Sequence, residues 1–78
     1  MSGVYLTRID PDHNMARYYA MSVQGTLFGE WSLVREWGRI GRGGQVRSTP
    51  FPTPAEAEAA LHRWRDAKAK RGYAAYSV

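Results

Sequence analysis

The chain of 78 residues contains no cysteine, which excludes disulfides and every zinc site built on cysteine ligands. Its two histidines, His13 and His62, lie far apart in the sequence and form no cluster of metal ligands. No apolar run approaches the roughly 20 residues that a membrane-spanning helix needs. The first residues also lack the basic and then apolar pattern of a signal peptide. We therefore expect a cytoplasmic protein with no metal, no cofactor and no membrane partner.

Recognisable catalytic patterns are missing as well. Asp10 and Asp12 flank a proline, and turn chemistry explains that arrangement. No serine or threonine stands in a recognisable order with a histidine and an acid. The glycine-rich stretch at residues 41–44 lacks the spacing and the lysine of a phosphate-binding P-loop. We expect no enzymatic activity.

Acidic residues are few beside the basic ones. The chain has 11 lysines and arginines, nine of them arginine, against 7 aspartates and glutamates, and its net charge is +4. Residues 37–55 hold three arginines and no acid. Guanidinium groups match phosphate oxygens in two-pronged contacts. The uneven charge favours a basic binding face, although codon usage in a high-GC genome gives the same excess of arginine when the excess is taken alone.

Alternation of apolar and polar residues predicts strands at residues 4–9, 15–24, 28–37, 45–49 and 73–78. The short connections between the first three favour an antiparallel meander. Pro50 and Pro52 should stop the fourth strand and place it at an edge or a rim.

One helix is predicted after the fourth strand. Thr53, Pro54 and Glu56 form a strong helix start, and Gly72 follows a helix that should run to about Arg71. One face of this helix should pack against the sheet, namely Ala57, Ala60, Leu61, Trp64 and Ala67. The expected fold is a single domain over residues 1–78, of class α+β, with a four- or five-stranded curved antiparallel sheet and one helix packed across it.

The most informative stretch, residues 36–47, reads Glu-Trp-Gly-Arg-Ile-Gly-Arg-Gly-Gly-Gln-Val-Arg. An indole at a strand end offers a flat face for a base or sugar, and nearby guanidinium groups can bind phosphates. Glycines around Arg39 allow the backbone to come close to a ligand. We therefore expect a nucleic-acid contact loop. Its candidate binding residues are Trp37, Gly38, Arg39, Arg42, Gln45 and Arg47.

The three tryptophans should differ in their surroundings. Trp64 lies on the apolar stripe of the helix and Trp31 lies in mid-strand, so both are expected in the core. Trp37 precedes the glycine-rich loop and is expected to be the most exposed of the three. The alternative for Trp37 is a ring that plugs one end of the sheet.

The arginines also have structural alternatives. Arg39 could pair with Glu36 or Asp66 and fix the loop, and Arg42 could be a solvated loop charge with no ligand.

The chain resembles the WGR domain, a module named for its Trp-Gly-Arg and found in DNA-dependent poly(ADP-ribose) polymerases and many bacterial proteins. The resemblance covers roughly residues 4–77. The matching positions are Tyr18-Tyr19, Gly29, Trp31, Trp37-Gly38-Arg39-Ile40-Gly41, Gly44-Gln45, Phe51-Pro52, Ala55-Glu56-Ala57 and Lys70-Arg71-Gly72-Tyr73. The resemblance implies a nucleic-acid-binding module without catalytic activity of its own. It also implies that Trp37 stacks on a DNA end, that Arg39 touches DNA, and that Arg47 contacts phosphate.

The favoured interpretation is a DNA-binding module that recognises ends, nicks or shape rather than base sequence. A protein-interaction adaptor is the main alternative, because the same aromatic and basic loop or a free sheet edge could dock a protein. Binding of single-stranded RNA is a third, and it requires Tyr18 or Tyr19 to be exposed next to Trp37. The sequence leaves the oligomeric state open.

Overall fold

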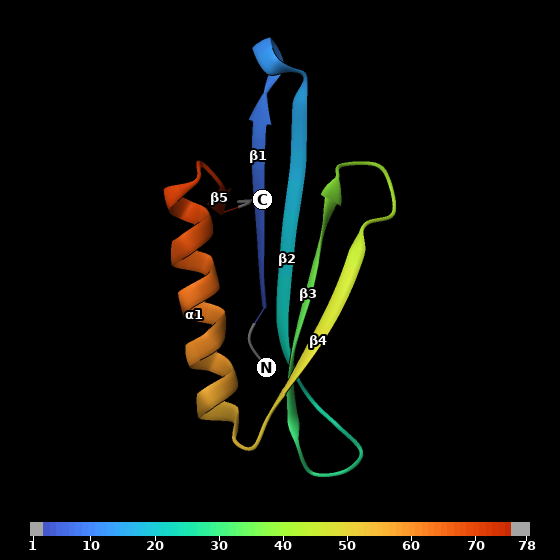
Figure 1. The fold of residues 1–78 in the computed structure, drawn as a ribbon, viewed down its shortest axis with the longest axis vertical. Helices are drawn as coiled ribbons and strands as arrows, with labels where there is room; N and C mark the ends of the chain where they lie inside the picture. The colour runs from blue at the N-terminus through green and yellow to red at the C-terminus, as the bar shows by residue number, and fades with distance from the viewer. Residues whose placement is uncertain (1–2, 76–78) are drawn as a thin grey trace.

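The computed structural model describes residues 3–75, in which one helix lies against a five-stranded antiparallel sheet of order β4-β3-β2-β1-β5 (Figure 1). The strands β1 to β4 follow each other as a meander, and β5 returns to the free edge of β1. The expected α+β class, the antiparallel order and the packed helix are confirmed. The elements are β1 (Gly3–Asp10), a short 3-10 turn (Pro11–His13), β2 (Met15–Gly25), β3 (Trp31–Arg39), β4 (Gln45–Phe51), α1 (Pro54–Lys70) and β5 (Ala74–Ala75).

The connection between β2 and β3 is longer than predicted, so β3 begins at Trp31. The hydroxyl oxygen of Thr26 accepts hydrogen bonds from the backbone N–H groups of Phe28 and Glu30, at 3.3 and 3.2 Å. Gly29 closes the turn with a φ of +81°, in the left-handed region that favours glycine. This turn leaves the side chains of Leu27 and Phe28 99% and 88% exposed.

Strand β4 also differs from its prediction, because it continues through Pro50 to Phe51. Pro50 lies opposite Ser32 in the register of β3 and β4. An edge strand tolerates a residue that has no N–H, and β4 is the edge of this sheet. At the other end of the chain, the predicted last strand is observed at Ala74–Ala75, and residues 76–78 lie outside the described part.

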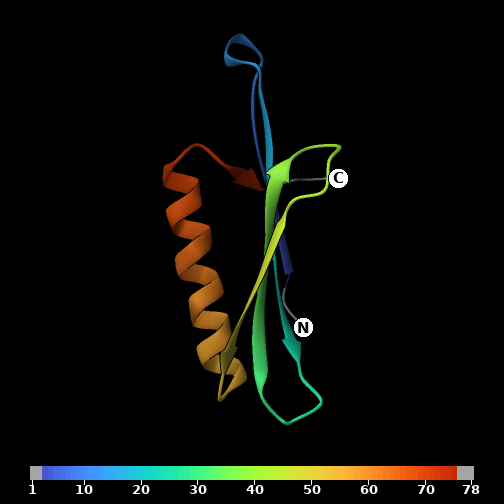
Figure 2. The same ribbon diagram turned by 45° about the vertical axis from the view of Figure 1, so that its right-hand side comes forward.

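The core lies between α1 and one face of the sheet (Figure 2). The helix begins as predicted, with the Thr53 hydroxyl accepting a hydrogen bond from the N–H of Glu56 at 3.2 Å. Aliphatic side chains fill most of the space, around the buried ring of Tyr19. The buried core residues are Leu6, Tyr19, Met21, Val23, Leu33, Ala57, Ala60 and Leu61.

The C-terminal half of α1 does not bury the face that its periodicity predicts. Trp64 remains 37% exposed, so its assignment to the core is wrong, and Ala67 is exposed although its spacing places it on the face that should pack against the sheet. The physical reason is the sheet residue that Trp64 meets. The guanidinium carbon of Arg35 lies 4.1 Å from the centroid of the Trp64 ring, where an aliphatic side chain would have completed the core.

The helix ends in a compact turn. The N–H groups of Gly72 and Tyr73 donate to the carbonyl oxygens of Ala69 and Lys68, both at 3.1 Å, and Gly72 has a φ of +94°. These bonds satisfy carbonyl groups that a helix end otherwise leaves free. The hairpin of β1 and β2 extends past this end of the helix (Figures 1 and 2).

Candidate nucleic-acid interface

All five arginines of the strands lie on the face of the sheet that α1 covers. Side chains alternate between the two faces of a strand. Arg8, Arg17, Arg35 and Arg39 each lie an even number of residues from a core residue of their own strand. Arg47 of β4 lies two residues from Thr49, which pairs with the core residue Leu33 of β3. Among residues 3–75, the strands place no lysine or arginine on the opposite face. The five are Arg8, Arg17, Arg35, Arg39 and Arg47.

The strand register arranges these arginines in two rows. Arg8 pairs with Arg17 and Arg17 with Arg39, which forms a row across β1, β2 and β3. Arg35 pairs with Arg47 across β3 and β4. Like charges at directly opposite positions destabilise a sheet. A bound anion would relieve this repulsion, so the arrangement favours a binding face.

A pocket of about 410 Å³ lies where the first row meets the C-terminal end of α1. Three of its lining residues are cations and none is an acid. Arg8 packs beside it on Gly72, where an added Cβ would lie 3.3 Å from the Arg8 Nε. The lining residues are Arg17, Tyr19, Trp37, Gly38, Arg39, Lys68 and Tyr73.

Trp37 forms part of the pocket wall and is only half-buried. Its ring lies nearly parallel to that of Tyr19, with 5.7 Å between the centroids, and the two residues are paired in the register of β2 and β3. Trp37 is less exposed than Trp64, so the prediction that it is the most exposed tryptophan is wrong. The buried ring of Tyr19 covers part of its surface, and the remainder borders the pocket.

The arrangement of tyrosines that RNA binding would require is absent. Tyr18 lies on the opposite face of the sheet, where its ring stacks on that of Tyr5 at 5.8 Å. Tyr19 does lie next to Trp37, but it is only 2% exposed. Binding of single-stranded RNA required Tyr18 or Tyr19 to be exposed next to Trp37, and the structure does not meet that requirement.

Arg39 pairs with neither of the acids considered for it. Its Nη1 and Nη2 donate to the backbone oxygen and the Oδ1 of Asn14, at 3.1 and 3.3 Å. Glu36 lies on the opposite face and accepts a hydrogen bond from Tyr18 at 2.8 Å, which raises the pKa of Tyr18 above 10.0. Asp66 lies 3.6 Å from the Nε of Arg65. Because both acceptors on Asn14 are neutral, the charge of Arg39 is held in place without being cancelled.

The glycines of the loop allow a close contact of the chain with itself. An added Cβ at Gly38 would lie 2.9 Å from the Cα of Gly44, and one at Gly44 would overlap the carbonyl oxygen of Trp37. Gly41 has a φ of +88°, which supports the turn between them. The close approach that the sequence suggests is therefore made by residues 38 and 44 to each other.

The remaining candidate residues lie outside the pocket lining. Arg42 is exposed in the loop, and its N–H donates to the carbonyl oxygen of Arg39 at 3.1 Å. Gln45 is exposed beside Trp37, and Arg47 is exposed beside Arg35. The structure thus brings Trp37, Gly38 and Arg39 together and leaves the other three along β4 and its loop.

Sequence reasoning missed Arg17, Lys68 and Tyr73. Strand alternation places Arg17 on the same face as Tyr19, but it does not show that this face borders a pocket with Arg39. The Nζ of Lys68 lies 4.6 Å from the centroid of the Tyr19 ring. Burial lowers the pKa of Lys68 below 10.5, and the nearby charges of Arg71 and Arg35 lower it further.

Residues 3–75 include no group of three or more histidine, aspartate or glutamate side chains arranged to hold a metal ion. Within the same range, no helix is long and apolar enough to cross a membrane.

Comparison with known proteins agrees with the resemblance. The model of the WGR domain matches residues 2–77. The chain is similar to the uncharacterized protein y4dW of Sinorhizobium fredii (strain NBRC 101917 / NGR234), with 46% identity over 70 residues. That alignment covers 90% of this chain and 34% of the relative, so the chain spans about a third of its length. No solved structure matches the chain significantly. The match over nearly all of its residues shows that this chain belongs to the WGR domain family, whose members are small nucleic-acid-binding modules rather than catalytic domains.

Proposed function

We propose that this chain binds DNA at ends, nicks or similar interruptions through the pocket beside the C-terminal end of α1. The observation that supports this most is the row of Arg8, Arg17 and Arg39 next to Trp37. The row lies on one face, and the pocket it borders has no acid in its lining.

The cations of the pocket supply the contacts to phosphate. Arg17, Arg39 and Lys68 line it from two strands and the helix, so they surround a bound anion from different directions. Contacts to phosphates position a protein on DNA but do not read its sequence. The C-terminal end of a helix repels an anion, and the closing turn of α1 lessens this repulsion because its hydrogen bonds occupy the carbonyl oxygens of Lys68 and Ala69.

The aromatic wall explains a preference for interruptions. Trp37 and Tyr73 offer ring surface beside the cations. Within an intact duplex the bases are stacked on each other, so a terminal sugar or base is the part of DNA that can meet these rings. Tyr19 backs the Trp37 ring and fixes its orientation.

A titration with three labelled DNAs tests the proposal. They are a blunt duplex, a nicked duplex with both ends closed by hairpins, and the same closed duplex without a nick. We expect the first two to bind more tightly than the third. Trp37→Ala should cost about 1–3 kcal/mol on the interrupted DNAs and less on the closed one. Equal affinity for all three would contradict recognition of interruptions, and no binding at low salt would contradict DNA binding itself.

A second candidate function is docking of a protein partner. The exposed Leu27 and Phe28 favour it, because an ordered turn presents two adjacent apolar side chains to solvent. This turn lies at the opposite end of the sheet from the C-terminal end of α1 (Figure 1), and the pocket is lined by residues near that helix end. Salt separates the two functions, since binding to phosphate weakens steeply as salt rises and apolar docking does not.

A further inference from the structure

We infer that Trp64 of α1 binds an unpaired base of a single-stranded extension that leaves the DNA end, with Arg47 and Arg63 contacting its phosphates. This inference rests on the proposed function and adds a second subsite to it. The subsite lies on α1, at a hollow lined by Arg63, Trp64 and Ala67, and Trp64 is not among the residues that line the pocket.

The ring of Trp64 is held firmly from one side. The guanidinium carbon of Arg35 lies 4.1 Å from the ring centroid, and the Nη1 of Arg35 donates to the Tyr19 hydroxyl at 3.1 Å. The Nε of Arg35 is buried and has no hydrogen-bond partner. Leaving this buried N–H group of Arg35 without a hydrogen-bond partner lowers the stability of the fold. A cation in this position polarises the ring and fixes its plane, as a stacking platform requires.

Another part of the ring borders a shallow hollow. This hollow has a volume of about 270 Å³ and is lined by Arg63, Trp64 and Ala67. The small side chain of Ala67 leaves the ring accessible, and Trp64 is 37% exposed. Stacking on an aromatic ring suits any base, because every base has a flat face.

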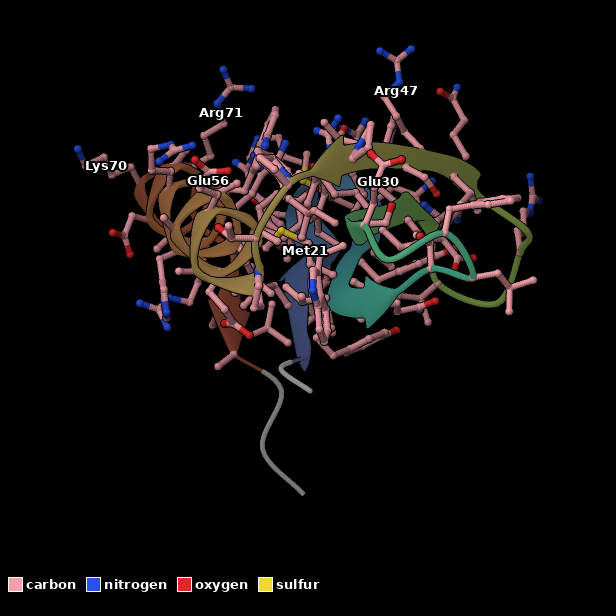
Figure 3. All side chains as sticks on the ribbon, turned by 90° about the horizontal axis from the view of Figure 1, so that it is seen from below. Met21, Glu30, Arg47, Glu56, Lys70 and Arg71 are labelled. Carbon is pink, nitrogen blue, oxygen red and sulfur yellow. The ribbon has the colours of Figure 1, made fainter. Side chains whose placement is uncertain are left out.

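Arg35 and Arg63 both lie at this ring, and no ion pair among residues 3–75 cancels their charges. Arg47 is exposed opposite Arg35 in the register of β3 and β4. The Arg47 and Arg71 side chains extend from the same side of the molecule, whereas Lys70 points away (Figure 3). In the described structure, ion pairs occur only between His13 and Asp10 and between Arg65 and Asp66. A polyanion is therefore the complementary partner for this side of the molecule.

The subsite is continuous with the pocket. The ring centroid of Tyr19 lies 6.2 Å from that of Trp64 and 5.7 Å from that of Trp37. A strand that leaves the pocket at Trp37 can therefore reach Trp64 by crossing over the buried Tyr19 and the Lys68 amine that lies on its ring. Because bases of a duplex are stacked on their neighbours, only an unpaired base has a face free for Trp64.

Duplexes with and without extensions test the inference. We compare a blunt duplex with the same duplex carrying a 3′ or a 5′ single-stranded extension. One polarity of extension should raise the affinity of the unmutated chain about tenfold or more, the effect of one stacked base. Trp64→Leu should remove that gain and leave blunt-duplex affinity unchanged, and Trp64→Phe should keep most of it.

Matched variants control for loss of a ring and loss of a charge. Phe28→Leu removes an exposed ring at the other end of the sheet and should leave the gain intact. Arg47→Gln should reduce the gain, whereas Lys70→Gln removes a charge that points away and should not. Thermal unfolding of each variant verifies that it is folded under the binding conditions.

Three results would overturn the inference. The first is equal affinity of the unmutated chain for blunt and extended duplexes, which would leave the proposed function intact. The second is a Trp64→Leu variant that keeps the gain, and the third is a Trp64→Phe variant that loses as much as Trp64→Leu. Absence of binding to every DNA would instead contradict the proposed function.

Discussion

The guanidinium of Arg39 donates two hydrogen bonds to Asn14, one to its backbone oxygen at 3.1 Å and one to its Oδ1 at 3.3 Å. Asn14 lies in the turn between β1 and β2 with a φ of +51°, a left-handed conformation that asparagine tolerates. The last residue of the Trp-Gly-Arg stretch is thus oriented by a neutral residue 25 positions earlier. The contact with Asn14 therefore fixes the orientation of the Arg39 guanidinium without neutralising its charge.

Asn14→Gly tests this positioning role. Glycine keeps the left-handed backbone and removes the Oδ1 acceptor without changing any charge. We expect DNA affinity to fall by about two- to tenfold, the effect of one hydrogen bond of about 0.5–1.5 kcal/mol. The slope of log affinity against log salt should stay unchanged, because no phosphate contact is lost. Titrations at several salt concentrations measure both quantities, and a reduced slope would show that Asn14 does more than orient Arg39.

Gly44→Ala should destabilise the fold, because its Cβ would overlap the carbonyl oxygen of Trp37. The chain must move to relieve this contact, at a cost of about 1–3 kcal/mol. Gly43→Ala is the matched control, since nothing lies within 4 Å of its added Cβ. Chemical denaturation of the two variants compares their free energies of unfolding. Equal stability would show that the loop can rearrange without cost.

Local patterns predict the elements of this fold well, because alternation and helix capping depend on neighbouring residues. The helix start at Thr53 and the strand containing Tyr19 follow from such patterns. The first residue of β3 is harder to predict from the sequence, because the hydroxyl of Thr26 stabilises a turn that the alternation of residues does not reveal.

The site was predicted only in part, because its assembly depends on register between strands. The sequence identifies Trp37 and Arg39 through the Trp-Gly-Arg stretch. It does not show that Arg17 lies beside Arg39 or that Lys68 reaches the same pocket, since these contacts join separate elements. The helix periodicity correctly turns Trp64 toward the sheet, but there its ring meets the guanidinium of Arg35 in place of an apolar core side chain.

Trp64→Ala should therefore cost less stability than a core substitution. A ring that is 37% exposed gives up less buried surface, and we expect a loss of about 1–2 kcal/mol that includes its contact with Arg35. Leu61 is 1% exposed, and Leu61→Ala should cost about 2–5 kcal/mol. Denaturation in urea measures both. A larger loss for Trp64→Ala than for Leu61→Ala would contradict this account of the helix interface.

DNA affinity should depend on pH through Lys68. Burial and the charges of Arg71 and Arg35 lower the pKa of Lys68 below 10.5. Phosphate favours the protonated amine, so affinity should fall as pH rises through that lowered pKa, and binding should take up protons there. Lys68→Arg keeps the charge at all these pH values and should flatten the dependence. An unchanged pH profile in Lys68→Arg would exclude Lys68 as its source.

The salt dependence of Arg17→Gln tests the central claim most directly, because Arg17 enters the site through strand register and not through the Trp-Gly-Arg stretch. The measurement is the slope of log affinity against log salt for a blunt duplex. Arg65→Gln is the control, since Arg65 lies beside Asp66 and away from the pocket. If the row of arginines binds phosphates, Arg17→Gln weakens binding and reduces the slope by about 0.9, while Arg65→Gln leaves it nearly unchanged. An Arg17→Gln variant with the affinity and slope of the unmutated chain would contradict the account.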